Sequence, residues 1–408
     1  MMKRQHAWPK GHWNWPIQVS HKHGIRCGDM IFFGGQVDLD MKGNVRNPDN
    51  LTAQTKSAMK FIRRVLAELD ADPADLVKLI CFYVHTEDAD ANRVLNAVAD
   101  FLDDNSGPVI TLIPLPALAY EHMVVEIEGI AMLSEDGSSI PRVVSHVENL
   151  PLLPKPLCHA LRCGEMIFVG GQTSVSSDGS VSNKHNLVAQ SEALMNRIGV
   201  LLRDLGAEFN DVVKINRYYV AGGTAQEWEG AALACASYFE EPGPAATGIP
   251  IPFLSRDGLM ASLEVTAMLN PDDTRISRQH VWPDGHWDWP VHLPYKHGIK
   301  CGRLIYIGGQ VSMDSKGVII DPGQLVTQTH TSIANIARIL DLFGAQLDDV
   351  VKVTAYYSGA ASAGMLHDNL RVRSASFNDP GPASTGIPMP CLAYEDMEIE
   401  IEVIAMLE

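Results

Sequence analysis

The amino-acid sequence consists of three related copies, and this repetition constrains the fold more than any other feature of the chain. The segments IFFGGQV, IFVGGQT and IYIGGQV place their first glycines at Gly34, Gly170 and Gly308, about one third of the 408 residues apart. Each copy also has RCG or KCG ahead of this segment and closes with VEIEGIAML, ASLEVTAML or IEIEVIAML. Motifs that recur in the same order indicate homologous structural units that pack against one another.

Polar segments that carry proline and glycine separate the copies. They are SEDGSSIPRVVSH and NPDDTRISRQ, near residues 135–148 and 270–278. Linkers of this composition indicate breaks between compact units. We therefore expect three units, at residues 1–136, 145–270 and 275–408.

Within a unit, the hydrophobic pattern alternates between the two-residue period of strands and the longer period of helices. In the first unit a hairpin around the CGD turn is predicted, followed by a helix at 51–71, a strand at 76–84, a helix at 89–104 and a strand at 121–133. This order is typical of an α+β fold in which both helices cover one face of a sheet.

Charge and composition exclude several classes of function. The formal net charge is −17, which repels nucleic-acid backbones and anionic membrane surfaces. No apolar run approaches the ~20 residues that span a bilayer, and the start of the chain lacks the apolar core of a signal peptide. The seven cysteines include no CxxC pair, which is typical of free thiols in a reducing compartment. We therefore expect a cytoplasmic protein that binds neither nucleic acid nor membranes.

The ordered set of IFFGGQV, the helix with TAQT, DLVKLICFYV and VEIEGIAML, repeated three times in register, resembles the RidA/YjgF family. The resemblance covers nearly the whole chain. It implies three chorismate-mutase-like units whose sheets pack into a barrel-like core with helices outside, so that one chain forms a pseudo-trimer with three clefts between units. It also implies hydrolysis of reactive imines and enamines to ketones and ammonia.

The family's site residues are only partly retained. In active members an arginine in a P-x-R segment holds the substrate carboxylate, a last-strand glutamate positions the attacking water, and an early tyrosine and a serine before GQ line the cleft. Here GPVITLIP, GPAATGIP and GPASTGIP contain no arginine, so the chain resembles an arginine-lacking branch. The glutamate is kept as Glu126 and Glu400 but is Ser262 in the second unit. The tyrosine is kept only as Tyr295, and glycine replaces the serine in every unit.

Glu126 and Glu400 are the candidate catalytic residues. Since side chains alternate along a strand, VEIEGI places Glu126 and Glu128 on the same face. A carboxyl buried beside a cleft has a raised pKa and can transfer protons to and from water. The alternative is a solvated strand face with its charges pointing outward.

The stretches WPKGHWNWP and WPDGHWDWP precede the first and third units, and the second unit lacks them. Their aromatic rings suit either stacking on a ligand or packing of the seam between units. Seam packing is the favoured interpretation, with Trp13 and Trp287 in the seam and His12 and His286 facing a ligand. The histidine spacings match no defined zinc pattern, so we expect neither a metal nor another cofactor.

Further candidates for substrate binding recur in register. Histidine titrates near neutral pH, and a threonine hydroxyl can hold a carbonyl or carboxylate oxygen. A structural role is the alternative for each of these residues. The remaining candidates are His23, His297, Thr111, Thr385 and the retained tyrosine, Tyr295.

The sequence favours a hydrolase of the deaminase type, in which Glu126 or Glu400 activates water in a cleft between units for attack on a small molecule. Units one and three share the Trp-His extension, KHG and EIE, whereas unit two lacks all three, so one or two working clefts are expected. The alternative is a non-catalytic protein that binds a small ligand. A ribonuclease is disfavoured by the net charge. In either case we expect a monomeric pseudo-trimer that can associate further with itself.

Overall fold

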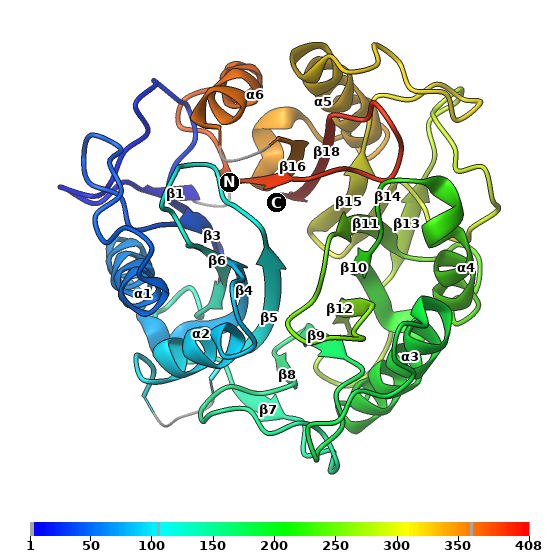
Figure 1. Ribbon diagram of the computed structural model, residues 1–408, viewed down its shortest axis with the longest axis horizontal. Helices are drawn as coiled ribbons and strands as arrows, with labels where there is room; N and C mark the ends of the chain where they lie inside the picture. The colour runs from blue at the N-terminus through cyan, green and yellow to red at the C-terminus, as the bar shows by residue number, and fades with distance from the viewer. Residues whose placement is uncertain (1–3, 104–106, 360–361, 408) are drawn as a thin grey trace.

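The computed structural model describes residues 4–103, 107–359 and 362–407. Three similar α+β units surround a common axis, with the sheets inside and the long helices outside (Figure 1). Hydrogen bonding groups the described strands into three separate six-stranded sheets. The expected pseudo-trimer of α+β units is confirmed, and its barrel-like core consists of three sheets that stay separate.

Unit 1 shows the arrangement that the other units repeat. Its sheet has the strand order β1-β2-β3-β6-β4-β5, in which only β4 and β5 run parallel. Unit 1 contains β1 (Arg4–Ala7), β2 (Gly24–Cys27), β3 (Met30–Gln36), α1 (Leu51–Glu68), β4 (Leu76–Val84), α2 (Asp90–Ala99), β5 (Val109–Leu115) and β6 (Val125–Met132). The predicted hairpin, helices and strands are present; both helices end earlier than predicted, and residue 104, the predicted end of the second helix, lies outside the described residues. No bounds were predicted for β1 and β5.

Units 2 and 3 have the same order of elements. The first strand of unit 2, β7, lies in the segment expected to be a linker and pairs with β8. Unit 2 contains β7 (Arg142–Val144), β8 (Ala160–Cys163), β9 (Met166–Thr173), α3 (Leu187–Asp204), β10 (Val212–Val220), α4 (Ala225–Ala236), β11 (Ala245–Ile251) and β12 (Ala261–Met268). Unit 3 contains β13 (Arg278–Val281), β14 (Gly298–Cys301), β15 (Leu304–Gln310), α5 (Leu325–Asp341), β16 (Val350–Ser358), α6 (Ala363–Ala375), β17 (Ala383–Met389) and β18 (Ile399–Met406).

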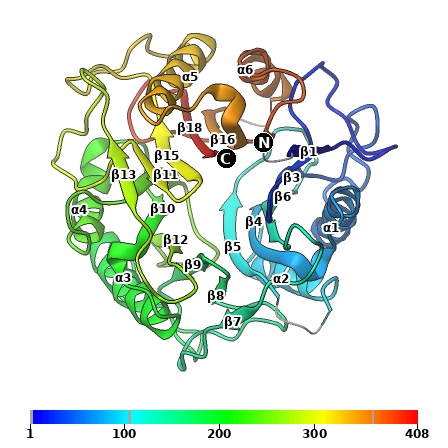
Figure 2. The ribbon, with the colours of Figure 1, turned by 180° about the vertical axis from the view of Figure 1, so that it is seen from behind.

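The helices form because each has one apolar stripe that the sheet can bury. In α1, Ala58, Ile62 and Val65 are fully buried against the unit 1 sheet. The Asn50 side chain caps the first turn by accepting a hydrogen bond from the backbone N–H of Ala53 at 3.0 Å. Seen from behind, the helices again lie outside the three sheets (Figure 2). No helix in the described part of the chain is long and apolar enough to cross a membrane.

The first glycine of each GGQ segment lets neighbouring units approach closely. Strand β17 of unit 3 lies against β3 of unit 1, β5 against β9, and β11 against β15. At Gly34 an added Cβ would overlap the backbone oxygen of Ser384, so any side chain there would push the units apart. Gly170 and Gly308 meet the backbone of Ile110 and Ala246 in the same way. The repeated glycine therefore serves the contacts between units.

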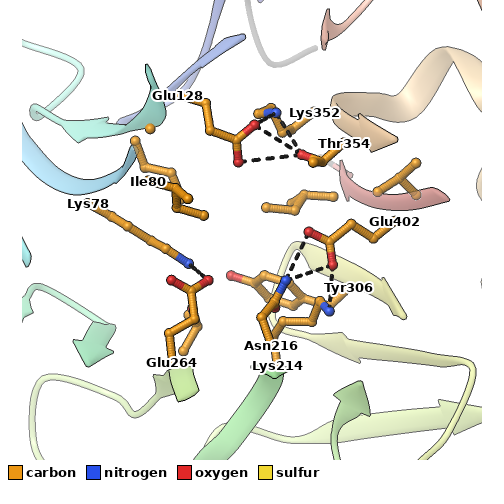
Figure 3. A pocket seen from close by; sticks show the side chains of 15 residues that line it. Lys78, Ile80, Glu128, Lys214, Asn216, Glu264, Tyr306, Lys352, Thr354 and Glu402 are labelled. Carbon is orange, nitrogen blue, oxygen red and sulfur yellow. Dashed lines mark hydrogen bonds and ion pairs between the residues drawn. The ribbon is translucent and has the colours of Figure 1, made fainter. Parts of the chain in front are cut away.

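A ring of ion pairs holds the three units together at the axis (Figure 3). Each pair joins a lysine of one unit to a glutamate of the next: Lys78 to Glu264 at 2.8 Å, Lys214 to Glu402 at 2.7 Å and Lys352 to Glu128 at 2.6 Å. These residues line a cavity with a volume of about 50 Å³. All six charges are paired across unit boundaries, so the ring neutralises itself and specifies which units are neighbours.

Candidate functional site

Strand β6 carries two glutamates on one face, as its alternating pattern predicts. Glu126 lies opposite Phe82 of β4, and Glu128 lies opposite Ile80 two residues further along. Both are buried, with 7% and 4% of their surface exposed. The alternative of a solvated strand face is therefore wrong. Glu128 points to the axial ion pairs, whereas Glu126 lines a separate cleft between units 1 and 3.

We call this first cleft the Arg373 cleft. Unit 1 contributes Glu126, and unit 3 contributes Arg373 from α6 and Ser384 from β17. About 20 Å³ of the cleft is open to the centres of water molecules. Its full lining comprises Trp13, Trp15, Gly35, Val37, Leu39, Ala119, Tyr120, Met123, Glu126, Leu366, Leu370, Arg373, Ser384 and Gly386.

Arg373 is fully buried and is held from two sides. Its Nε donates to Oδ1 of Asn369 at 3.0 Å, and its Nη1 donates to Oγ of Ser384 at 2.8 Å. Its Nη2 has no hydrogen-bond partner among the described residues. A buried guanidinium with a spare N–H is suited to an anionic ligand, because an unmet donor costs free energy until it is paired.

Burial and, after it, the negative charge of Glu128 raise the pKa of Glu126 to about 8, although Lys352 and Arg373 oppose the shift. The carboxyl of Glu126 lies directly on Gly35, where an added Cβ would overlap its Oε1. The second glycine of IFFGGQV is therefore required to make room for the carboxyl. Near pH 7 Glu126 is largely protonated and can act as an acid.

The second cleft, which we call the Arg217 cleft, lies between units 3 and 2. As at Glu126, the carboxyl of Glu400, on β18, lies directly on a glycine, Gly309. Burial and, after it, the negative charge of Glu402 raise the pKa of Glu400 to about 8. About 50 Å³ of the cleft is open to the centres of water molecules. Its full lining comprises Arg217, Tyr219, Trp228, Ala246, Gly248, Trp287, Trp289, Leu293, Tyr295, Gly309, Val311, Met313, Ala393, Tyr394, Met397 and Glu400.

The two clefts each contain an arginine at an equivalent position, but the two arginines come from different structural elements. Arg217 extends from strand β10, where it pairs with Gly248, and an added Cβ on Gly248 would lie 3.0 Å from its Nη2. Arg373 extends from helix α6, and an added Cβ on the equivalent Gly386 would lie 2.9 Å from its Nη2. The strand position of Arg217 is Ala355 in unit 3, opposite Gly386. The segments that resemble the family's P-x-R segment contain no arginine, as the sequence shows, and in these two clefts an arginine arrives from another element.

The interface between units 1 and 2 lacks this pair. Ser262 occupies the place of the glutamate, and its Oγ would lie 3.0 Å from a Cβ on Gly171. Cys81 occupies the strand position of Arg217. Arg256 replaces the tyrosine that the other clefts carry as Tyr120 and Tyr394. Of the interfaces that the structure describes, two therefore combine a carboxyl with a guanidinium.

Tryptophans of the two Trp-His extensions line both clefts, but the histidines of these extensions do not. Trp13 lines the Arg373 cleft, and Trp287 lines the Arg217 cleft. His12 and His286 were expected to face a ligand, but each bonds through Nε2 to a glutamine Oε1 at 2.8 Å. Burial lowers the pKa of both to about 4. They are neutral near pH 7 and help to hold the tryptophans in position.

His23 and His297 are also part of this packing. Their Nε2 atoms bond to the backbone oxygens of Trp13 and Trp287 at 3.1 and 3.0 Å. The His23 ring stacks on Trp15, with centroids 5.2 Å apart. Burial lowers the pKa of both histidines well below the ordinary value. Neither residue lines the clefts described above.

Thr111 and Thr385 point toward the axis and not into the clefts. The Thr385 hydroxyl accepts hydrogen bonds from the Gly35 N–H at 2.9 Å and from Lys352 Nζ at 3.0 Å. Thr111 accepts from the Gly171 N–H at 2.9 Å and donates to Glu264. These threonines stabilise the contacts between units, which corrects the expectation that they bind substrate. Tyr295, in contrast, does line the Arg217 cleft.

Sequence reasoning noted Arg217 in NRYYV without assigning it a role, and it missed Arg373 and one pair of tyrosines. Tyr120 and Tyr394 recur as ALAYE and CLAYE in units 1 and 3 only, the same distribution as the retained glutamates. That correlation could have identified them. Arg217 and Arg373 had no such signal, because they stand at different positions of their units.

Comparison with known proteins shows what the chain is similar to. A sequence model of the family described as endoribonuclease L-PSP matches it three times, over residues 17–133, 150–268 and 289–407. A RutC family protein of Pyrococcus abyssi is 36% identical over 115 residues, which are 28% of this chain and 87% of that relative. The 2-iminobutanoate/2-iminopropanoate deaminase of Mus musculus is 27% identical over 113 residues, 28% of this chain and 81% of the relative.

One solved structure is similar along most of the chain. The crystal structure of a chorismatase superposes with a TM-score of 0.54 at 14% sequence identity, covering 81% of this chain and 93% of the other. At this identity the likeness shows a shared fold alone.

Proposed function

The chain belongs to the endoribonuclease L-PSP family, the RidA/YjgF family that its motifs resemble, and from this premise we propose that it hydrolyses the C=N bond of small imino acids, including those that form when enamino acids tautomerise. The observation that carries the proposal is a pair of groups found twice. In each of two clefts, a protonated carboxyl of raised pKa shares the cleft with a buried arginine of the neighbouring unit.

The arginine is proposed to bind the substrate carboxylate. Nη2 of Arg373 has no partner among the described residues, and Nε of Arg217 also lacks one. A carboxylate that takes these donors forms a charge-assisted hydrogen bond in surroundings that exclude water, where such bonds are strongest. The imine carbon, bonded directly to the carboxylate carbon in a 2-imino acid, would then lie near the glutamate.

The glutamate is proposed to move protons in both directions. Protonated Glu126 or Glu400 gives its proton to the imine nitrogen and becomes a carboxylate. The carboxylate then takes a proton from a water molecule as the water oxygen bonds to the imine carbon. The carboxyl next protonates the amine of the resulting carbinolamine and recovers the hydroxyl proton as the C–N bond breaks. The net reaction converts imine and water to 2-oxo acid and ammonia, and the carboxyl is regenerated.

Two alternatives are less well supported. Cleavage of RNA would require a basic binding surface, whereas the chain carries a net charge of −17 and the clefts admit only small molecules. A ligand-binding protein without turnover is favoured by one observation, the absence of arginine from the segment where active relatives are expected to carry it. The buried carboxyls of raised pKa favour catalysis, because a binding site for an anion gains nothing from an extra acidic group.

The test uses Glu126→Gln, Glu400→Gln and the double variant. Each single variant should lose turnover at one cleft. In the double variant the rate of hydrolysis should fall by about 100-fold or more, which is the typical contribution of general acid–base catalysis. The substrate is 2-iminobutanoate, generated in solution by an amino-acid-deaminating enzyme, and the formation of 2-oxobutanoate is followed.

Ser262→Ala is the matched control, since Ser262 occupies the glutamate position at the remaining interface. It should leave the rate unchanged. Wild-type turnover by the double variant would refute the mechanism. Saturable binding of 2-oxobutanoate without any turnover by the wild-type chain would establish the ligand-binding alternative.

A further inference from the structure

We infer that the two clefts act on different substrates: the Arg373 cleft on imino acids with a short aliphatic side chain, and the Arg217 cleft on imino acids with a larger, planar aromatic side chain. The inference rests on the proposed function, because it assumes that the arginine in each cleft binds a carboxylate. It follows from the groups that surround this common anchor.

The element that supplies the arginine decides how much room is left. In the Arg373 cleft, Leu366, Leu370 and Arg373 follow one face of α6 and fill the space beside Glu126. In the Arg217 cleft the arginine comes from strand β10, so helix α4 does not have to supply one. The open space is correspondingly about 50 Å³ in the Arg217 cleft and about 20 Å³ in the Arg373 cleft.

Helix α4 carries different side chains at the positions equivalent to these three. Counted from the first residue of each helix, Leu366 corresponds to Trp228, Leu370 to Ala232 and Arg373 to Cys235. Ala232 and Cys235 are small, which leaves room, and Trp228 places an indole ring in the lining.

Six of the sixteen residues that line the Arg217 cleft are aromatic, against three of fourteen in the Arg373 cleft. Trp228 and Tyr394 meet at 6.0 Å between centroids and 80°, and Trp289 and Tyr295 at 6.4 Å and 72°. Tyr219 lies beside Arg217 on the same strand face. These rings expose large aromatic surfaces, and a planar guest that packs against them gains both buried area and favourable ring geometry.

The tyrosine hydroxyls distinguish the clefts further. The hydroxyls of Tyr295 and Tyr394 are buried and lack hydrogen-bond partners among the described residues. In the Arg373 cleft, the counterpart of Tyr394 is Tyr120, whose hydroxyl is 3.0 Å from Nε2 of His367. Beyond its arginine, the Arg217 cleft therefore offers a ligand two unpaired tyrosine hydroxyls, whereas the hydroxyl of Tyr120 in the Arg373 cleft is paired, which favours an aromatic side chain with a hydroxyl or a ring nitrogen.

Binding of two reaction products tests the inference. The probes are 2-oxobutanoate and phenylpyruvate, titrated by calorimetry into the full chain and into Arg217→Met and Arg373→Met. Phenylpyruvate should bind wild type and Arg373→Met alike and should lose at least tenfold in affinity with Arg217→Met. 2-Oxobutanoate should bind wild type and Arg217→Met alike and should lose at least tenfold in affinity with Arg373→Met. A tenfold difference is what a hydrophobic pocket achieves for a mismatch of one or a few carbon atoms.

A residue swap tests the pocket without touching either anchor. Trp228→Leu, which installs the side chain of its counterpart Leu366, should weaken phenylpyruvate at least tenfold and leave 2-oxobutanoate within twofold. Trp228→Phe keeps an aromatic ring and should retain phenylpyruvate binding. Because Trp228 is also packed in the core of unit 2, the thermal midpoint of each variant is measured, and the two arginine variants decide the question where the leucine variant fails to fold.

The outcomes separate this inference from the proposed function. If Arg217→Met and Arg373→Met each remove half of the phenylpyruvate sites, the clefts are alike, and the inference is overturned while the proposed function stands. The same conclusion follows if Trp228→Leu leaves phenylpyruvate affinity unchanged. If neither acid binds to the wild-type chain, or if both arginine variants bind both acids normally, the proposed function fails and the inference with it.

Discussion

Replacing both Glu126 and Glu400 with glutamine should flatten the dependence of folding stability on pH. Burial raises the pKa of each carboxyl to about 8 in the folded chain, against an ordinary value of 4.5. Between these values the folded protein keeps a proton that the unfolded chain has released. The stabilisation from these protons is complete below pH 4.5 and is lost as the pH rises to about 8. Glutamine does not titrate, so the double variant lacks this loss.

The magnitude follows from the size of the shift. Each carboxyl changes the free energy of unfolding by about 1.4 kcal/mol per pH unit within the window. From about pH 5.5 to 7.5 the wild type should therefore lose about 2.5 kcal/mol for each glutamate, or about 5 kcal/mol for both, relative to the double variant. The buried histidines give an opposite trend below their ordinary pKa, but they are present in both proteins and cancel in the comparison.

Urea titrations followed by tryptophan fluorescence measure this difference at several pH values across the window. Glu135→Gln removes an exposed carboxylate and is the control, which should follow the wild-type curve. If the wild type and the double variant lose the same free energy of unfolding between pH 5.5 and 7.5, the two glutamates are not buried acids. The proposed protonated state at neutral pH would then be untenable as well.

Two further substitutions test other parts of the structure. In a Glu400→Gln background, Gly35→Ala should abolish the remaining turnover on 2-iminobutanoate, because the new Cβ would overlap Oε1 of Glu126; unchanged activity would show that the carboxyl lies elsewhere. Lys352→Met leaves Glu128 buried without its lysine and should cost about 3–5 kcal/mol in urea titrations. Adding Glu128→Leu should restore most of that loss, and failure to do so would mean that the ion pair is not the source.

Much of the fold could be predicted from the sequence because it depends on local patterns that occur three times. The hydrophobic period determines helices and strands, and the repetition of the GGQ segment aligns the units. Alternation along β6 placed Glu126 and Glu128 on one face, and the structure confirms this. The joint loss of the Trp-His extension and the glutamate in unit 2 led us to expect one or two working clefts, and two clefts contain a glutamate, whereas Ser262 occupies its position at the remaining interface.

Side-chain direction beyond the choice of face could not be predicted in the same way. Thr385 recurs in register at the position where the family binds ligand, yet its hydroxyl bonds to Lys352 and the Gly35 N–H between units. His12 was expected to face a ligand, but its Nε2 is hydrogen-bonded to Gln36, and Trp13 lines the cleft instead. These outcomes depend on which partner lies nearest after packing, and that partner is 24 to 350 residues away in the sequence.

The sequence by itself determined the three α+β units and the two units that keep a glutamate. Only the tertiary structure decided which units share a cleft and which arginine serves each glutamate. Glu126 and Arg373 belong to the first and third units, and Glu400 and Arg217 to the third and second. A periodic pattern reports the surroundings of a residue along its own element. A cleft between units, however, can receive a guanidinium from a strand or from a helix, and both solutions satisfy the same local patterns.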